Sequence, residues 1–156
     1  MPTLNAAAPD FSLHANKEKK FGPSDFKGLT LILAFFPGAF TGVCTKEACA
    51  LRDAEAALNE FDVAVLGVCV DSIFAIGAWV EKNDLSFPVV SDFDRVAIRA
   101  YDVVHEGFAV PGYVAAKRSV FILDGEGVLR WSWVAPSPGT EPDYEAIKAA
   151  VAAINA

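Results

Sequence analysis

Continuous apolar runs alternate along this chain with segments whose apolar residues recur at spacings of three and four. Residues 29–36 and 63–70 have the length and composition of strands buried on both faces of a sheet. Residues 44–59 and 72–83 are predicted to be helices. Asp71 or Ser72 is expected to cap the second of them. The apolar face of the first helix is predicted to hold Ala48, Leu51, Ala54, Ala57 and Leu58.

Shorter elements are predicted before and after this central part. Residues 11–13 and 19–21 favour a small β-hairpin near the N-terminus. Residues 87–90 are predicted to form a short strand and residues 94–101 a short helix. Residues 104–116 contain two glycines and a proline, and we expect them to form a loop.

In the last third of the chain, two predicted strands are joined by a hairpin turn instead of by a helix. Residues 119–123 and 128–134 are predicted strands, and the sequence Asp-Gly-Glu-Gly at 124–127 is a strong turn signal between them. Residues 141–154 are predicted to form a closing helix. Together these elements predict an α/β fold with a mixed central β-sheet flanked by helices.

Length and composition narrow the class of protein. A chain of 156 residues with 53% hydrophobic and 12% aromatic residues predicts a single packed domain over residues 1–156. No apolar run approaches the length of a membrane-spanning helix, and the first residues do not resemble a signal peptide, so we expect a cytoplasmic protein. The net charge of −7 argues against a nucleic-acid partner.

The three cysteines do not indicate a disulfide scaffold or a metal centre. A chain of this length would need more cysteines for a disulfide framework. Cys44 and Cys49 have no second close pair, and the two histidines, His14 and His105, lie elsewhere in the sequence. Structural zinc requires four nitrogen or sulfur ligands, so no metal and no cofactor is expected.

Cys44 lies where a predicted strand ends and a predicted helix begins. The first turn of a helix presents unpaired N–H groups and the positive end of the helix dipole, which favour a thiolate over a thiol. Cysteines in such positions are frequently reactive. Cys44 is therefore a candidate nucleophile.

Two residues before Cys44 strengthen this interpretation. Pro37, Thr41 and Cys44 have the spacing P-x-x-x-T-x-x-C. Pro37 ends the strand and is expected to shield the thiol from water. Thr41 lies one helical turn before the sulfur, where its hydroxyl could share a face with the thiol. Taken alone, Thr41 could equally be an ordinary helix cap.

The motif around Cys44 resembles the active site of peroxiredoxins. The segments Ala8-Pro-Asp-Phe-Ser-Leu13 and Arg118-Ser-Val-Phe-Ile-Leu-Asp124 are similar to the opening segment and the arginine-bearing strand of that family. The resemblance implies a thioredoxin-like fold and the reduction of hydrogen peroxide and organic hydroperoxides. In that chemistry the Cys44 thiolate attacks the peroxide and becomes a sulfenic acid.

The resemblance also implies roles for other residues. Arg118 would stabilise the thiolate and hold the peroxide oxygens, and Glu47 would orient Arg118. The segment from Cys44 to Cys49 is similar to the peroxiredoxin Q or bacterioferritin comigratory protein subgroup, in which a second cysteine five residues on resolves the first. Residues 38–43 are more similar to AhpE and to peroxiredoxin 5.

The spacing of the two cysteines has a mechanical consequence. Residues five apart in a helix have Cα atoms separated by about 8.6 Å. A disulfide needs Cα atoms within about 7 Å. A bond between Cys44 and Cys49 therefore requires the first helical turns to unwind, which would expose the disulfide to a reductant such as thioredoxin or glutaredoxin.

Alternatives remain open from the sequence. Cys49 could fill a helix face while an external thiol resolves Cys44, or the protein could relay oxidation to a partner. A general thioredoxin-like disulfide oxidoreductase is disfavoured because the chain lacks a C-x-x-C pair. We expect Cys69 to be an inert core thiol, and we expect a monomer or a small homodimer.

Overall fold

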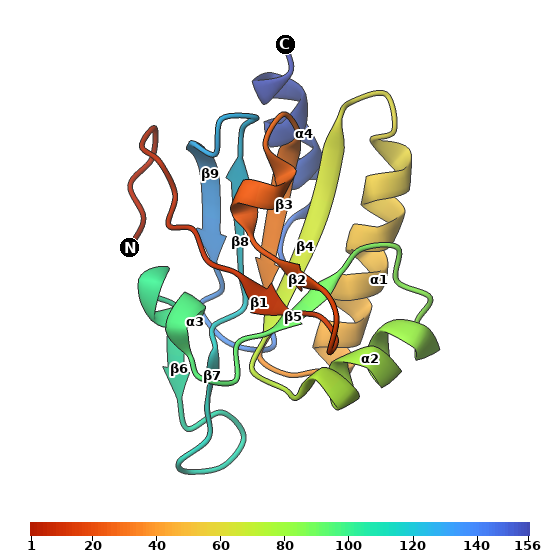
Figure 1. Cartoon of the computed structure of the whole chain (residues 1–156). Helices are drawn as coiled ribbons and strands as arrows, with labels where there is room; N and C mark the ends of the chain where they lie inside the picture. Colours follow the sequence, from red (N-terminus) through yellow and green to blue (C-terminus); the bar gives the residue numbers. More distant parts are fainter.

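The structure, a computed structural model, describes residues 1–156. Its centre is a five-stranded mixed sheet with the strand order β5-β4-β3-β8-β9 (Figure 1). Strands β3, β4 and β5 are parallel, whereas β8 runs antiparallel to β3 and β9 antiparallel to β8. The strands are β3 (Thr30–Phe35), β4 (Val63–Cys69), β5 (Val89–Ser91), β8 (Ser119–Leu123) and β9 (Leu129–Val134).

The central strand β3 is apolar throughout because both faces of the sheet are covered. All of its residues are buried. Its side chains alternate between two separate hydrophobic clusters, as the two-residue period of a strand requires. Ile32 and Ala34 point to one cluster, and Leu31, Leu33 and Phe35 point to the other.

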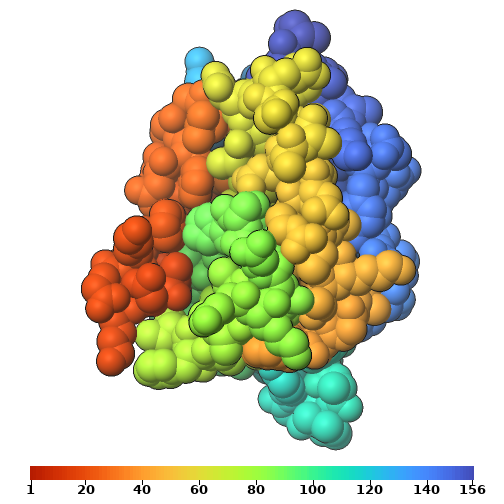
Figure 2. Space-filling view, turned by 90° about the vertical axis from the view of Figure 1, so that its right-hand side faces the viewer, coloured from red at the N-terminus to blue at the C-terminus, as the bar shows by residue number.

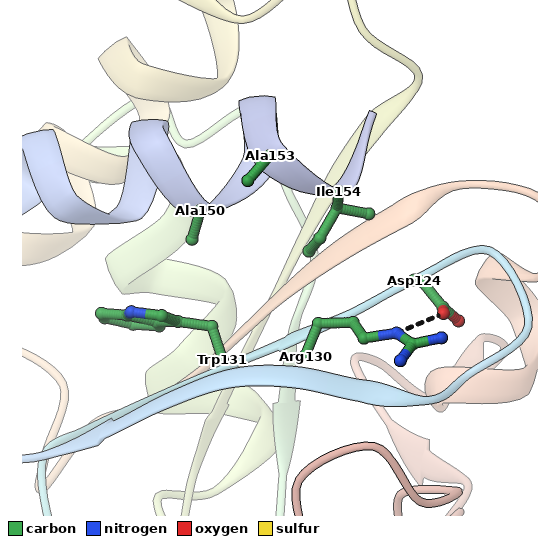
Figure 3. A pocket seen from close by; sticks show the side chains of 6 residues that line it. All are labelled: Asp124, Arg130, Trp131, Ala150, Ala153 and Ile154. Atoms are coloured by element: carbon green, nitrogen blue, oxygen red, sulfur yellow. Dashed lines mark hydrogen bonds and ion pairs between the residues drawn. The ribbon is translucent and has the colours of Figure 1, made fainter. Parts of the chain in front are cut away.

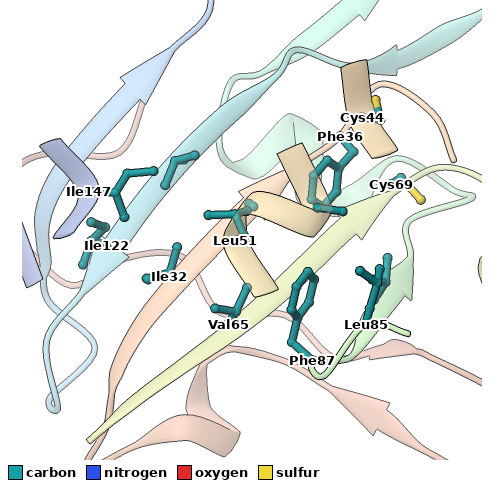
Figure 4. Close-up of a cluster of buried hydrophobic side chains, with 14 of the residues drawn as sticks. Ile32, Phe36, Cys44, Leu51, Val65, Cys69, Leu85, Phe87, Ile122 and Ile147 are labelled. Carbon is teal, nitrogen blue, oxygen red and sulfur yellow. The ribbon is translucent and has the colours of Figure 1, made fainter. Parts of the chain in front are cut away.

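One face of the sheet is covered by three helices, α1 (Gly42–Ala57), α2 (Ile73–Lys82) and α4 (Tyr144–Ile154). Each contributes fully buried side chains to the same core cluster, among them Leu51 from α1 and Ile147 from α4 (Figure 4). Asp143 caps α4 by accepting hydrogen bonds from two backbone N–H groups of its first turn.

The opposite face is covered by smaller elements. They are the hairpin of β1 (Leu13–His14) and β2 (Lys20–Phe21), the 3-10 helix η1 (Pro23–Phe26) and the helix α3 (Val96–Ala100). Tyr101 lies at the centre of this second cluster, packed against Phe35 and Phe121. The predicted N-terminal hairpin, the mixed sheet and its flanking helices are thus confirmed.

The prediction of a loop over residues 104–116 is wrong. Strands β6 (Val104–Glu106) and β7 (Val114–Ala116) form an antiparallel two-stranded ribbon there. The glycines that suggested a loop occupy its turn, where Gly107 and Gly112 have φ values of +74° and +86° that favour glycine. The tip of this ribbon projects from one end of the molecule in Figure 2.

The predicted bounds of the helices need smaller corrections. Helix α1 begins at Gly42 rather than Cys44, and α4 begins at Tyr144, after its cap, rather than at residue 141. Ala57 is exposed and does not belong to the buried face of α1. The buried stripe continues from Ala54 to Leu58, and Ala57 lies to the side of it. No helix in the structure is long and apolar enough to cross a bilayer.

Candidate active site

Cys44 is the third residue of α1 and lies just beyond the end of β3. Its side chain is completely buried and belongs to the core cluster beneath the helix (Figure 4). Strand β3 is followed directly by a tight turn over residues 36–41, so the strand and the turn together fix where the first turn of α1 begins. The sulfur therefore lies at the positive end of a sixteen-residue helix.

The side chain of Arg118 makes three separate contacts around this sulfur. Its Nη2 donates to Cys44 Sγ at 3.4 Å, and its Nη1 donates to Glu47 Oε1 at 2.9 Å. Its Nε donates to the carbonyl oxygen of Pro138 at 2.9 Å. Burial opposes the charge, but Cys44 and Glu47 outweigh it and raise the pKa of the guanidinium. Arg118 is thus a cation held in one fixed plane beside the sulfur.

The sheet register explains how residues 74 positions apart meet. Strand β8 runs antiparallel to β3, and Ser119 at its start pairs with Phe35 at the end of β3. The residue before β8 therefore reaches the turn that follows β3. This residue is Arg118, and the turn leads to Cys44.

Glu47 is a fully buried carboxyl group on the next turn of α1. Burial raises its pKa to about 7, although the hydrogen bond and charge of Arg118 act in the opposite direction. Its Oε2 has no hydrogen-bond partner. These surroundings differ from those of an ordinary exposed acid at the start of a helix.

Thr41 is the N-cap residue of α1, but its side chain makes no capping hydrogen bond. The hydroxyl instead donates to the carbonyl oxygen of Gly38 at 2.8 Å. No hydrogen bond joins it to Cys44. Because its proton is used within the turn, the oxygen of Thr41 keeps lone pairs that can accept a hydrogen bond. Pro37, four residues earlier, is buried.

Asp71 holds the turn in place, a role that the sequence did not indicate. Its Oδ2 accepts a hydrogen bond from the backbone N–H of Ala39 at 2.9 Å. Asp71 lies two residues beyond the end of β4, so the segment after the neighbouring strand supports the turn after β3. Ser72, not Asp71, caps α2 by accepting from the N–H of Ala75.

The two other cysteines have different surroundings. Cys49 is partly exposed on α1, which is continuous from Gly42 to Ala57, and all three thiols are free. Cys69 is completely buried in β4, and burial raises the pKa of its thiol well above the ordinary value. This agrees with the expectation that Cys69 is an inert core residue.

A second layer of polar residues surrounds the arginine, and it was not found from the sequence. Lys46 pairs with Glu141 at 3.1 Å, and the Tyr144 hydroxyl donates to Glu141 Oε1 at 2.7 Å. These two contacts lower the pKa of Glu141, the bond from Tyr144 contributing most. The N-terminal end of α4 is thereby fastened to the first turns of α1.

Of two cavities in the structure, one adjoins the candidate site and the other does not. One of about 320 Å³ is lined by Arg118 together with His105 and Pro138, so His105 lies near the candidate site although it is distant in the sequence. Another of about 440 Å³ lies between β9 and α4 and contains none of the predicted site residues (Figure 3). There Trp131 packs below Ala150, and Arg130 is paired with Asp124.

Comparison with known proteins identifies the family. Residues 4–132 match the model of the AhpC/TSA family, and the chain belongs to that family. It is 35% identical over 127 residues to a putative peroxiredoxin Bcp of Coxiella burnetii, covering 81% of this chain and 84% of the relative. It is 34% identical over 132 residues to peroxiredoxin Bcp of Bacillus subtilis, covering 83% of each.

Solved structures support the same assignment. The bacterioferritin comigratory protein of Xanthomonas campestris is similar with a TM-score of 0.83, 25% identity and 98% of both chains covered. AhpC of Enterococcus faecalis has a TM-score of 0.86 at 23% identity, covering 99% of this chain and 93% of that one, which shows the shared fold. The thioredoxin-like fold and the resemblance to peroxiredoxins are therefore confirmed. The protein is a thiol peroxidase, an oxidoreductase that reduces peroxides at the expense of a thiol reductant.

Proposed function

We propose that Cys44 is the peroxidatic residue of this enzyme and that Cys49 resolves it. The Cys44 thiolate attacks one oxygen of the peroxide, the O–O bond breaks, and the other oxygen leaves as water or an alcohol after taking up a proton. Cys44 is thereby oxidised to a sulfenic acid. The Cys49 thiol then displaces the hydroxyl group as water, and a Cys44–Cys49 disulfide forms.

The observation that carries this proposal is the contact of Arg118 with both Cys44 and Glu47. A buried cation 3.4 Å from the sulfur stabilises the negative charge that attacks the peroxide. The charge moves onto the peroxide oxygens in the transition state, where the same guanidinium can follow it. Glu47 and the Pro138 carbonyl fix the plane of the guanidinium, so little reorganisation is needed.

Thr41 completes the proposed peroxide site. Because its hydroxyl donates to Gly38, its oxygen is left to accept the proton of a bound hydroperoxide. Arg118 and the backbone N–H of Cys44 would act as the complementary donors. Pro37 is buried beside this site and is proposed to keep water from the sulfur.

Organic hydroperoxides are proposed as substrates in addition to hydrogen peroxide. The solved structure from Xanthomonas campestris is described in terms of alkyl peroxide reduction. In this chain Phe40 adjoins Thr41 and is half exposed, with a relative accessibility of 51%. Its ring could form an apolar collar at the entrance to the site, a suitable neighbour for an alkyl chain.

The recycling step requires a change in α1. Cys44 and Cys49 lie on one continuous helix, at a separation too long for a disulfide. We propose that the first turns unwind after oxidation and that the exposed disulfide is reduced by thioredoxin or a glutaredoxin-type donor in the cytoplasm. A monomer or small homodimer is proposed as the working form.

The decisive experiment is the intact mass of the protein after one equivalent of hydrogen peroxide, with peptide mapping under non-reducing conditions. The expected result is the loss of two hydrogens, mapped to Cys44 and Cys49. In Cys49→Ser the expected product is instead a sulfenic acid on Cys44. An unmodified Cys44 in both proteins would refute the peroxidatic assignment.

The same experiment and a turnover assay separate the two alternatives. A sulfenic acid on Cys44 in both wild type and Cys49→Ser would favour resolution by an external thiol, because Cys49 would then be a structural residue. Continuous peroxide consumption with a generic dithiol donor would identify a peroxidase. Oxidation that is reversed only by one particular protein would favour the relay.

A further inference from the structure

A hydrogen bond beside the candidate nucleophile connects α1 to α2. The indole Nε1–H of Trp79, on α2, donates to the hydroxyl oxygen of Thr45 at 3.0 Å. Thr45 is the residue after Cys44. Trp79 is completely buried, and an indole has a single hydrogen-bond donor. Thr45 is therefore the one partner that satisfies the polar group of Trp79.

Trp79 also supports the turn that precedes Cys44. Its ring packs edge to face against Phe36, with ring centroids 5.5 Å apart and an interplanar angle of 77°. Phe36 is the residue between β3 and Pro37, and both Phe36 and Cys44 belong to the same core cluster as Trp79. Figure 4 shows Phe36 and Cys44 within this cluster. The indole thus lies between the helix that carries the sulfur and the turn that leads to it.

Unwinding the first turns of α1 would break this hydrogen bond. Thr45 lies inside the segment from Cys44 to Cys49, so it must move when the two sulfurs approach. Trp79 has no such reason to move, because α2 is capped independently by Ser72. The indole N–H would then lose its acceptor, and an unsatisfied buried donor is costly.

We propose that the Thr45–Trp79 hydrogen bond is a latch that keeps α1 wound and sets the rate of disulfide formation. Thr45 is a positioning residue in this scheme. The inference rests on the proposed role of Cys49 as the resolving thiol. In the step concerned, the Cys49 thiol attacks the Cys44 sulfenic acid, the S–O bond breaks, an S–S bond forms and water leaves.

Two other contacts of the same segment, those of Lys46 and of Cys44, are weaker candidates for this control. The ion pair of Lys46 with Glu141 has a lysine side chain that is 74% exposed, and such pairs contribute little. The contact of Arg118 with Cys44 depends on charge, and oxidation replaces the thiolate by a neutral sulfenic acid. The Thr45–Trp79 hydrogen bond involves neither charge nor the reacting sulfur, so it persists after oxidation.

The test is the rate of Cys44–Cys49 disulfide formation in Thr45→Val, measured by rapid alkylation and mass spectrometry after one equivalent of hydrogen peroxide. Valine keeps the shape and β-branching of threonine but cannot accept the indole proton. We expect disulfide formation about five- to tenfold faster, the factor that corresponds to one lost hydrogen bond. With excess peroxide, the fraction of Cys44 oxidised to sulfinic acid should fall accordingly, while Thr45→Ser should behave like wild type.

Thr30→Val is the matched control. Thr30 also accepts a side-chain hydrogen bond, from Asn155 at 3.1 Å, but it lies at the start of β3, at the opposite end of the strand from the turn that leads to Cys44. This variant should lose thermal stability without faster disulfide formation. Equal acceleration in both variants would mean general loosening and would overturn the latch.

Two further measurements keep the outcome unambiguous. Trp79→Phe removes the donor instead of the acceptor and decides the question should Thr45→Val not fold. Sulfenic acid formation in the Cys49→Ser background should keep its rate when Thr45→Val is added, because the latch acts after the first step. A wild-type protein that forms the disulfide at the same rate as Thr45→Val refutes the latch alone. A wild-type protein that forms no disulfide refutes the role of Cys49.

Discussion

At the scale of single residues, the guanidinium of Arg118 links three different acceptors around the candidate site. Its planar guanidinium donates three hydrogen bonds in fixed directions, to the sulfur of Cys44, a carboxyl oxygen of Glu47 and the backbone carbonyl of Pro138. A lysine ammonium in the same position would carry the same charge, but it is a point charge on a flexible stem. The identity of the residue therefore matters through geometry as well as charge.

We accordingly expect Arg118→Lys to reduce kcat/KM for hydrogen peroxide by about 10²–10³-fold, the range seen when one preorganised donor is removed from a transition state. The measurement is the second-order rate of peroxide consumption at fixed pH. Arg130→Lys is the matched control, because Arg130 pairs with Asp124 in the cavity of Figure 3 and should have no effect on the rate. Equal rates for wild type and Arg118→Lys would contradict the proposed role.

The buried carboxyl group of Glu47 should make the free energy of unfolding depend on pH, and the direction of this dependence follows from its burial. Its pKa rises from 4.5 to about 7 in the folded protein, so between these values the folded state retains a proton that the unfolded chain has released. The contribution of this group to the free energy of unfolding is therefore largest below about pH 4.5 and falls as the pH rises toward 7.

Glu47→Gln should remove this component. The free energy of unfolding of wild type minus that of Glu47→Gln should fall by about 1–3 kcal/mol from pH 4.5 to 7.5. Urea denaturation across this pH range measures it, and Glu145→Gln, at an exposed position of α4, serves as the control. A difference that rises with pH would show that Arg118, rather than burial, dominates the titration of Glu47.

At the scale of elements, the ends of β3, β4 and β8 meet at one edge of the sheet and build the site jointly. Strand β3 leads into the turn before Cys44, β8 begins next to Arg118, and β4 ends two residues before Asp71. The turn itself has no regular structure to stabilise it. Its position depends on hydrogen bonds from neighbouring elements, of which the bond from Ala39 to Asp71 is one.

Asp71→Ala should therefore lower kcat/KM by about tenfold, since a loosened turn displaces Thr41 and the start of α1 from their productive alignment. Peroxide consumption under single-turnover conditions measures the effect. Asp71→Asn retains an acceptor oxygen and should recover most of the activity. If the alanine and asparagine variants were equally slow, the charge of Asp71 and not its hydrogen bond would be the important property.

The sequence predicted the elements whose signal is local. The buried strands β3 and β4 are continuous apolar runs, and the turn between β8 and β9 has a strong glycine signal. The proximity of Cys44 and Arg118 came from family resemblance, because spacing along the chain does not indicate it. The ribbon of β6 and β7 was missed because its strands are only three residues long and its glycines resemble those of a loop.

The surroundings of the site were harder to predict for the same reason. Glu141, Tyr144 and Pro138 approach Arg118 only because α4 packs against α1, a contact that depends on the whole fold. Asp71 was predicted, as an alternative to Ser72, to cap the nearest helix, since capping is a common role for an aspartate at such a position. Thr45 gave no signal, because its partner Trp79 is 34 residues away.

At the scale of the whole molecule, the sheet separates two cores of different character. The cluster under α1, α2 and α4 includes Cys44 and the latch residue Trp79, so this face of the sheet carries the candidate site. The cluster on the other face, centred on Tyr101, contains none of the proposed catalytic residues. Motion of α1 can therefore be confined to one layer while the sheet and its second face remain intact.

The complete burial of Cys44 has a consequence for the order of the two half-reactions. A small peroxide needs only to reach one sulfur through the turn, whereas the thiol of a reductant protein arrives on a bulky surface. While α1 is wound, such a surface is excluded from Cys44, so the reduced enzyme is closed to its own electron donor. In the proposed cycle, oxidation followed by unwinding would open the site to the reductant, so that the peroxide and the reductant react with the enzyme in a fixed order.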